Sequence, residues 1–89
     1  MEIKKGRNRV EILIDNKVVA FATYSLIKDD VVNINHTMVQ TTFRGQKIAS
    51  KLMETIVEIL IESNMKCIPS CSYAASWFEK HEEYKYLIY

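Results

Sequence analysis

The sequence is poor in the residues that break a chain or staple it together. Its 89 residues include only two glycines, one proline and two cysteines. A collagen-like or low-complexity chain is therefore excluded, and a hydrophobic content of 48% excludes a disordered one. Cys67 and Cys71 are too few for a secreted disulfide framework, and their spacing matches no paired zinc site. We expect free thiols and no metal site.

Long apolar runs are also lacking. No stretch of about 18 apolar residues could cross a membrane, and residues 1–5 lack the apolar segment of a signal peptide. A net charge of +1 gives no overall basic field of the kind nucleic-acid-binding proteins usually show. We expect one cytoplasmic domain, residues 1–89, with no membrane or nucleic-acid partner.

Acidic residues are missing from one long window. Between Val31 and Met53 there is no Asp or Glu, whereas Arg44, Lys47 and Lys51 all lie within it. The local excess of positive charge indicates an anion-binding region more clearly than the total charge does.

The first half of the chain reads as β-structure. Residues 10–15 and 18–26 are rich in β-branched and aromatic residues, and Asp15-Asn16 between them indicates a hairpin turn. Residues 31–40 form a third extended run, in which strict alternation predicts two faces. One face would carry Val32, Ile34, His36, Met38 and Gln40, and the other Val31, Asn33, Asn35, Thr37 and Val39.

The second half alternates helices and strands. Apolar residues recur every three or four positions from Ile48 to Ile61, which predicts a core-facing helix that ends at a left-handed Asn64. Residues 65–71 read as a strand that Pro69 restricts to an edge or an opening. A second helix over residues 73–82, capped by a serine among residues 70–72, and a last strand over residues 84–89 complete an α+β chain.

The junction at Arg44-Gly45-Gln46-Lys47 is a strand, a glycine turn and a helix start. The first N–H groups of a helix have no intrahelical partner, so they bind anions. Cations at a helix start oppose its dipole at a cost of roughly 0.3–1 kcal/mol each, which a bound polyanion would offset. An ordinary turn with surface lysines nearby explains the motif equally well when it is taken alone.

Taken with the order of the elements, the segment from Arg44 to Leu52 resembles the GNAT superfamily of N-acetyltransferases, whose Q/R-x-x-G-x-G/A motif stands at this junction. Residues 36–39, 69–75 and 81–84 are similar to the small single-domain acetyltransferases of that superfamily. The resemblance covers almost the whole chain. It implies a mixed, mainly antiparallel sheet with two main helices and a V-shaped cofactor cleft.

The resemblance also implies acetyl-CoA as co-substrate. Pantetheine would pair with the backbone near Met38 and Val39, and the diphosphate with the N–H groups that follow Gly45. The implied cofactor-binding residues are Met38, Val39, Arg44, Gly45, Gln46, Lys47, Ile48, Ala49, Ser50 and Tyr73.

The chain departs from the family pattern at three positions. Lys47 replaces the first glycine of the motif, which matters if the backbone there requires a positive φ. Met38 stands where small relatives often carry an acid, and so removes an obvious general base. Phe78 stands where larger enzymes place a tyrosine that protonates the departing thiolate, and it cannot donate a proton.

Two residues are candidates for catalysis. Cys71 precedes a helix N-terminus, where the pKa of a thiol falls, so it could protonate the leaving CoA or accept the acetyl group transiently. His36 is the second candidate, as a general base, because histidine is the residue type that suits this role near neutral pH. Buried structural roles are the alternatives, and such a role fits Cys67 best.

The sequence thus predicts an N-acetyltransferase that moves the acetyl group of acetyl-CoA to an amine by direct attack in a ternary complex. The acceptor could be a lysine side chain, a polyamine or a small metabolite, and a monomer or a weak dimer are both open. A non-catalytic CoA or acyl-CoA binding module is one alternative. A domain that binds nucleic acid or an acidic protein through Arg44, Lys47 and Lys51 is another.

Overall fold

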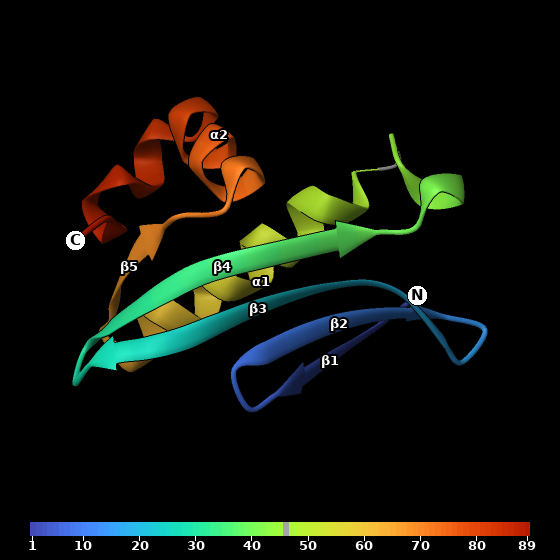
Figure 1. Ribbon diagram of the computed structural model, residues 1–89, viewed down its shortest axis with the longest axis horizontal. Coiled ribbons are helices and arrows are strands. Elements are labelled where there is room, and N and C mark those ends of the chain that lie inside the picture. Colours follow the sequence, from blue (N-terminus) through green and yellow to red (C-terminus); the bar gives the residue numbers. More distant parts are fainter. Residues whose placement is uncertain (46) are drawn as a thin grey trace.

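A computed structural model describes residues 1–45 and 47–89. Five strands form one sheet in the order β1-β2-β3-β4-β5, and Figure 1 shows them with the helices. The first three of the four pairings are antiparallel, and only the last, between β4 and β5, is parallel. The elements are β1 (Glu2–Gly6), β2 (Arg9–Ile14), β3 (Lys17–Lys28), β4 (Val31–Val39), the short 3₁₀ helix η1 (Thr41–Phe43), α1 (Ile48–Ser63), β5 (Lys66–Pro69), α2 (Ser72–Lys80) and the 3₁₀ helix η2 (Glu82–Leu87).

The hairpin turn between β2 and β3 is as predicted. Asp15 and Asn16 have φ values of 52° and 64°, the left-handed conformation that twisted two-residue turns require. The prediction of three antiparallel strands before the glycine turn was wrong, because β1 pairs with β2 and makes four. Only Ile3 of β1 is shielded from solvent, so this edge strand has no alternating apolar pattern to reveal it.

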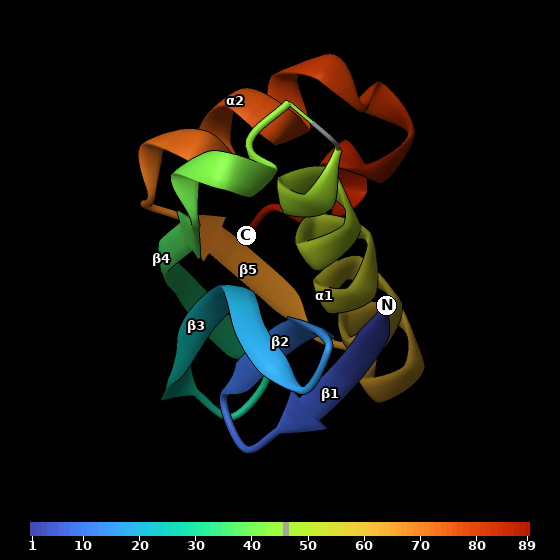
Figure 2. The same cartoon turned by 90° about the vertical axis from the view of Figure 1, so that its right-hand side faces the viewer.

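Helix α1 packs across one face of the sheet and contacts β2, β3 and β4 (Figure 2). Its 3.6-residue periodicity places Leu52, Met53 and Ile56 at 0% exposure against Val10 and Ile12 of β2 in one hydrophobic core. Asn64 ends the helix with φ 57°, and its N–H donates to the carbonyls of Leu60 and Ile61, as predicted. Within the described ranges, none of the helices combines the length and apolarity that a bilayer span needs.

A β-bulge interrupts β4 and changes the predicted faces of that strand. Thr23 pairs with His36 and Tyr24 pairs with Ile34, so the register skips Asn35. One inserted residue exchanges the two faces of everything beyond it. Ile34 therefore faces the core, but so does Thr37, which pairs with the fully buried Ala22. The strict alternation predicted for residues 31–40 was wrong from Asn35 onward.

Strands β4 and β5 separate after a short parallel pairing. Val31–Ile34 pair with Lys66–Pro69, but β4 continues to Val39 whereas β5 ends at Pro69. Just beyond β5, the N–H of Cys71 donates to the carbonyl of Ile34 at 3.1 Å. This is the V-shaped opening that the family resemblance implied, and Pro69 lies at its edge.

The C-terminal end differs from the prediction in two respects. The expected last strand over residues 84–89 is the 3₁₀ helix η2, followed by a single bridge from Ile88 to Cys67. Tyr84 and Leu87, three residues apart, both pack on the core, which is the periodicity of a 3₁₀ turn and not of a strand. The expected serine cap of α2 is also wrong, because Cys71 is the N-cap residue.

Candidate active site

A pocket of about 510 Å³ opens where β4 parts from β5. Four segments meet around it, namely the end of β4, the η1 turn, the first turn of α1 and the start of α2. Figure 1 shows these segments on the same side of the molecule. The lining residues are Thr37, Val39, Phe43, Arg44, Gly45, Lys47, Ile48, Ala49, Ser50 and Tyr73.

The helix start in this pocket presents free backbone donors. Among the described residues, the N-cap Lys47 makes no capping hydrogen bond with its side chain, and the first turn of α1 holds no acidic residue. Lys47 is the N-cap and adopts a left-handed conformation with φ 61°, so the position taken by a non-glycine residue does require a positive φ. Gly45 has φ 83°, and a Cβ added there would meet no atom within 4 Å. The turn is thus open to a ligand.

The end of β4 contributes backbone groups. The N–H of Gln40 donates to the carbonyl of Val19 on β3, so alternation along the strand directs the N–H and C=O of Thr37 and Val39 away from β3. Arg44 Nε donates to the carbonyl of Val39 at 3.3 Å, consistent with that direction. An extended ligand in the opening can therefore pair with Thr37 and Val39.

Cys71 lies at the point where the strands part. Its Sγ is 3.5 Å from Thr37 Oγ1. Burial alone would raise the pKa of the thiol, but hydrogen bonds from the Thr37 hydroxyl and from the backbone N–H groups of Ala74, Tyr73 and Thr37 outweigh it and lower the pKa. The Cys71 sulfur thus has raised thiolate character beside the pocket.

Cys67 has the opposite environment. It lies on β5 at 0% exposure, and burial raises the pKa of its thiol to about 11. This residue is a structural cysteine, as the sequence suggested. Across residues 1–45 and 47–89, no three His, Cys, Asp or Glu side chains gather as metal ligands.

Ser50 and Tyr73 bring α1 and α2 together at the pocket. Ser50 Oγ accepts a hydrogen bond from the indole Nε1 of Trp77 at 3.0 Å and donates to Glu54 Oε2 at 3.4 Å. Tyr73 lines the pocket, and burial, together with the negative charge of Glu54, raises the pKa of its hydroxyl. Tyr73 is therefore protonated at neutral pH.

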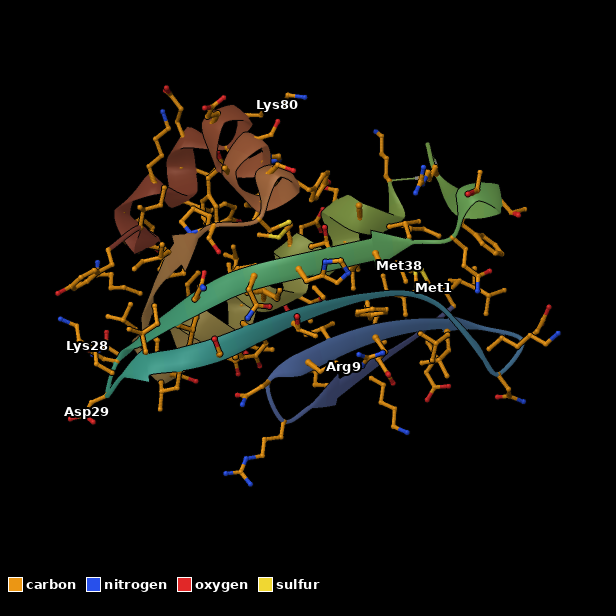
Figure 3. All side chains as sticks on the ribbon, in the orientation of Figure 1. Met1, Arg9, Lys28, Asp29, Met38 and Lys80 are labelled. Atoms are coloured by element: carbon orange, nitrogen blue, oxygen red, sulfur yellow. The ribbon has the colours of Figure 1, made fainter. Side chains whose placement is uncertain are left out.

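Most of the predicted binding residues line the pocket, whereas the predicted residues His36 and Met38 lie elsewhere. Gln46 lies outside the described residues. His36 and Met38 share the opposite face of the sheet with their partners Thr23 and Phe21, and the ring of His36 is 5.7 Å from that of Phe21. Figure 3 shows Met38 near the end of β4. Neither side chain lines the pocket, and the alternation along β4 directs the backbone N–H and C=O of Met38 toward Phe21 on β3.

Two lining residues were missed in the sequence. Thr37 lies within residues 36–39, which resemble the family, but the predicted alternation did not include the bulge at Asn35 and so assigned Thr37 to the wrong face. Phe43 is the only apolar side chain between Val39 and Ile48, and a lone aromatic in a polar turn was the available signal.

Comparison with protein-family models identifies the class. Residues 9–87 match the model described as GCN5-related N-acetyl-transferase. This match spans nearly the whole chain, and the sheet, the two main helices and the open helix start agree with it. The chain belongs to the GCN5-related N-acetyltransferase family.

Two solved structures resemble the chain. The first is the solution structure of a GCN5-like protein from Staphylococcus aureus proposed to be an N-acetyltransferase. It is 36% identical with a TM-score of 0.81, over 99% of this chain and 87% of that one. The second is the aminoglycoside N-acetyltransferase AAC(6')-Iy in complex with CoA, at 15% identity and a TM-score of 0.62, over 81% of this chain and 63% of that one, a likeness of fold alone. No curated protein sequence matches the chain.

Proposed function

We propose that this protein transfers the acetyl group of acetyl-CoA to an amine by direct attack in a ternary complex. The observation that carries the proposal is the pocket itself. It joins the first turn of α1, which Lys47 does not cap with its side chain, to the free backbone edge of a splayed strand and ends beside a thiol of lowered pKa. Membership of an acetyltransferase family and the fold shared with a CoA-bound enzyme both support this reading.

The residues present fit acetyl-CoA. The first turn of α1 would take the diphosphate, with Arg44 and Lys47 supplying countercharge at the pocket rim. Pantetheine amides would pair with the backbone of Thr37 and Val39 in the opening between β4 and β5. The thioester then arrives near Cys71, because Thr37 contacts both the pocket and Cys71 Sγ.

In the proposed transfer, the amine nitrogen bonds to the carbonyl carbon of the thioester while the C–S bond breaks. Cys71 gives a proton to the departing CoA sulfur, and the attacking amine gives up one proton. That proton passes to water in the open pocket, because His36 lies on the opposite face of the sheet and does not line the pocket. A transient acetyl group on Cys71 is the alternative route, because thiolate character favours attack by sulfur as well.

The acceptor is a lysine side chain, a polyamine or a small metabolite. An amine must lose its proton before attack, so the acceptor reacts in its neutral form. A screen of the three acceptor classes by CoA release would rank them.

Calorimetric titration with acetyl-CoA and CoA tests the binding step. We expect saturable binding by the wild type and a loss of about 100-fold or more in the variant Arg44→Ala with Lys47→Ala, since each charge-assisted contact contributes roughly 1.5–3 kcal/mol. Lys4→Ala with Arg7→Ala removes the same charge from exposed positions that do not line the pocket, and serves as the control. Absence of binding by the wild type would refute the proposal.

The catalytic step is tested with Cys71→Ala and intact mass. Direct transfer predicts that Cys71→Ala slows amine-dependent CoA release without changing the affinity for CoA. It also predicts that no acetylated protein accumulates in the absence of an amine. An added acetyl mass on the wild type that Cys71→Ala abolishes would establish the covalent route in its place.

A non-catalytic CoA or acyl-CoA binding module is the second candidate. Met38 in place of an acid and Phe78 in place of a tyrosine favour it, because Phe78 is 1% exposed in the core and donates no proton. Binding of acetyl-CoA without CoA release by any amine class would decide for the module.

A further inference from the structure

Trp77 lies behind the residues that line the pocket and contacts one of them. It lies one helical turn after Tyr73 on α2, is 3% exposed, and is not itself a lining residue. Its indole N–H donates to the hydroxyl of Ser50, which lines the pocket from the first turn of α1. A single hydrogen bond thus connects the two helices that bound the pocket.

The indole ring is held in one orientation. His81 stacks on it with ring centroids 3.8 Å apart and planes 12° from parallel, and Tyr84 stacks at 5.8 Å and 15°. Phe78 meets it edge to face at 5.3 Å, and His81 Nδ1 lies 2.7 Å from the carbonyl of Trp77. These aromatic contacts fix where the N–H points.

This arrangement decides how the hydroxyl of Ser50 is used. A serine hydroxyl has one proton to donate and accepts through its lone pairs. Because the indole occupies a lone pair, the proton remains for donation, and its acceptor is Glu54 Oε2 at 3.4 Å. That distance is long for a hydroxyl hydrogen bond, so a phosphate oxygen at the first turn of α1 would compete well for the proton.

We propose that Trp77 is a positioning residue for the diphosphate of CoA. It keeps Ser50 oriented as a donor and holds the first turn of α1 against α2. This inference rests on the proposed function, because it takes the diphosphate of CoA as the ligand of that turn.

The test is a double-mutant cycle on CoA affinity, measured by titration calorimetry. Trp77→Phe keeps an aromatic ring and removes the N–H, and we expect it to weaken CoA binding about three- to tenfold, the size of one net hydrogen bond. Ser50→Ala should weaken binding too. Trp77→Phe should have almost no further effect in the Ser50→Ala background, because the route through the hydroxyl is already lost.

A control separates positioning from general destabilisation. Ile12→Val shortens a fully buried side chain on β2 and leaves the rings around Trp77 intact, so it should lower the thermal midpoint but change the CoA dissociation constant less than about twofold. An equal loss of affinity in Ile12→Val, or equal effects of Trp77→Phe with and without Ser50, would overturn the inference alone. A wild type that binds no CoA would overturn the proposed function, and the inference with it.

Discussion

At the scale of single residues, the two cysteines show how environment sets chemistry. They lie four positions apart, yet burial raises the pKa of the Cys67 thiol to about 11 whereas hydrogen bonds lower that of Cys71. Cys71 is only half-buried, beside the pocket, whereas Cys67 is fully buried in β5. Reactivity toward thioesters is therefore expected at one of them.

The Cys67 thiol predicts a loss of stability in alkali. The ordinary thiol pKa is near 9.0, so between about pH 9 and 11 the unfolded chain releases this proton while the folded chain keeps it. The folded state then binds more protons, and the free energy of unfolding falls as the pH rises, by up to about 2–3 kcal/mol. Urea unfolding of the wild type and Cys67→Ala, at about pH 8 and about pH 10.5, measures this difference.

Cys67→Ala should be less stable than the wild type at the lower pH, since it leaves a small cavity, but its stability should fall less toward the higher pH. Lysines and tyrosines titrate in both proteins, so the difference in slope isolates the thiol. Parallel pH profiles in the two proteins would contradict a buried, protonated Cys67.

At the scale of elements, the start of α1 carries conformational strain. Lys47 has φ 61°, which costs a residue with a Cβ roughly 1–2 kcal/mol. Glycine removes this strain but adds about 0.5–1 kcal/mol of unfolded-chain entropy. Lys47→Gly should therefore raise the free energy of unfolding by about 0.5–1 kcal/mol in a urea titration.

Lys51→Gly is the matched control, the same substitution one turn later. Lys51 lies inside the helix, where glycine costs about 1 kcal/mol, so this variant should be less stable than the wild type. If both variants lose stability equally, Lys47 is not held in a left-handed conformation in solution.

The sequence predicted those elements whose local signals agree with their final environment. Asp15-Asn16 and Asn64 predicted their turns correctly because short polar side chains tolerate a positive φ. The glycine turn and the start of α1 were predictable for the same kind of local reason. Most of the candidate site follows from that one segment and its resemblance.

The remaining features depend on contacts with residues elsewhere in the chain, which a local sequence pattern does not reveal. Strand β1 is mostly exposed, and it forms because it pairs with the edge of β2. The aromatic run at Tyr84 to Tyr89 has strand-like composition, but its apolar contacts lie three residues apart, on η2. The bulge at Asn35 rests on hydrogen bonds with Thr23 and Ser25 on the neighbouring strand, and it moved Thr37 into the pocket.

At the scale of the whole molecule, the pocket gathers segments that are far apart in the chain. Thr37 on β4 and Tyr73 on α2 meet there with the first turn of α1. A ligand that contacts all three segments stabilises the folded state as a unit. At a concentration about 100 times its dissociation constant, such a ligand adds about 2.7 kcal/mol.

We therefore expect saturating CoA to raise the thermal midpoint by roughly 10–20 °C, given about 4–8 °C per kcal/mol for a chain of this size. Differential scanning calorimetry measures the shift. Tripolyphosphate at the same concentration is the control for charge alone, and its shift should be much smaller because it cannot fill the opening between β4 and β5. Equal shifts would mean that only the helix start binds.

The bulge in β4 also bears on how relatives of this chain are compared. Because Asn35 is an extra residue in the strand, every later side chain of β4 lies on the opposite face from the one that strict alternation predicts. A relative without that extra residue would carry its pocket-facing side chains one position earlier in the sequence. Aligning the two without a gap would match the inner residues of one protein with the outer residues of the other. The pocket residue Thr37 would then be aligned with a residue that faces away from the pocket.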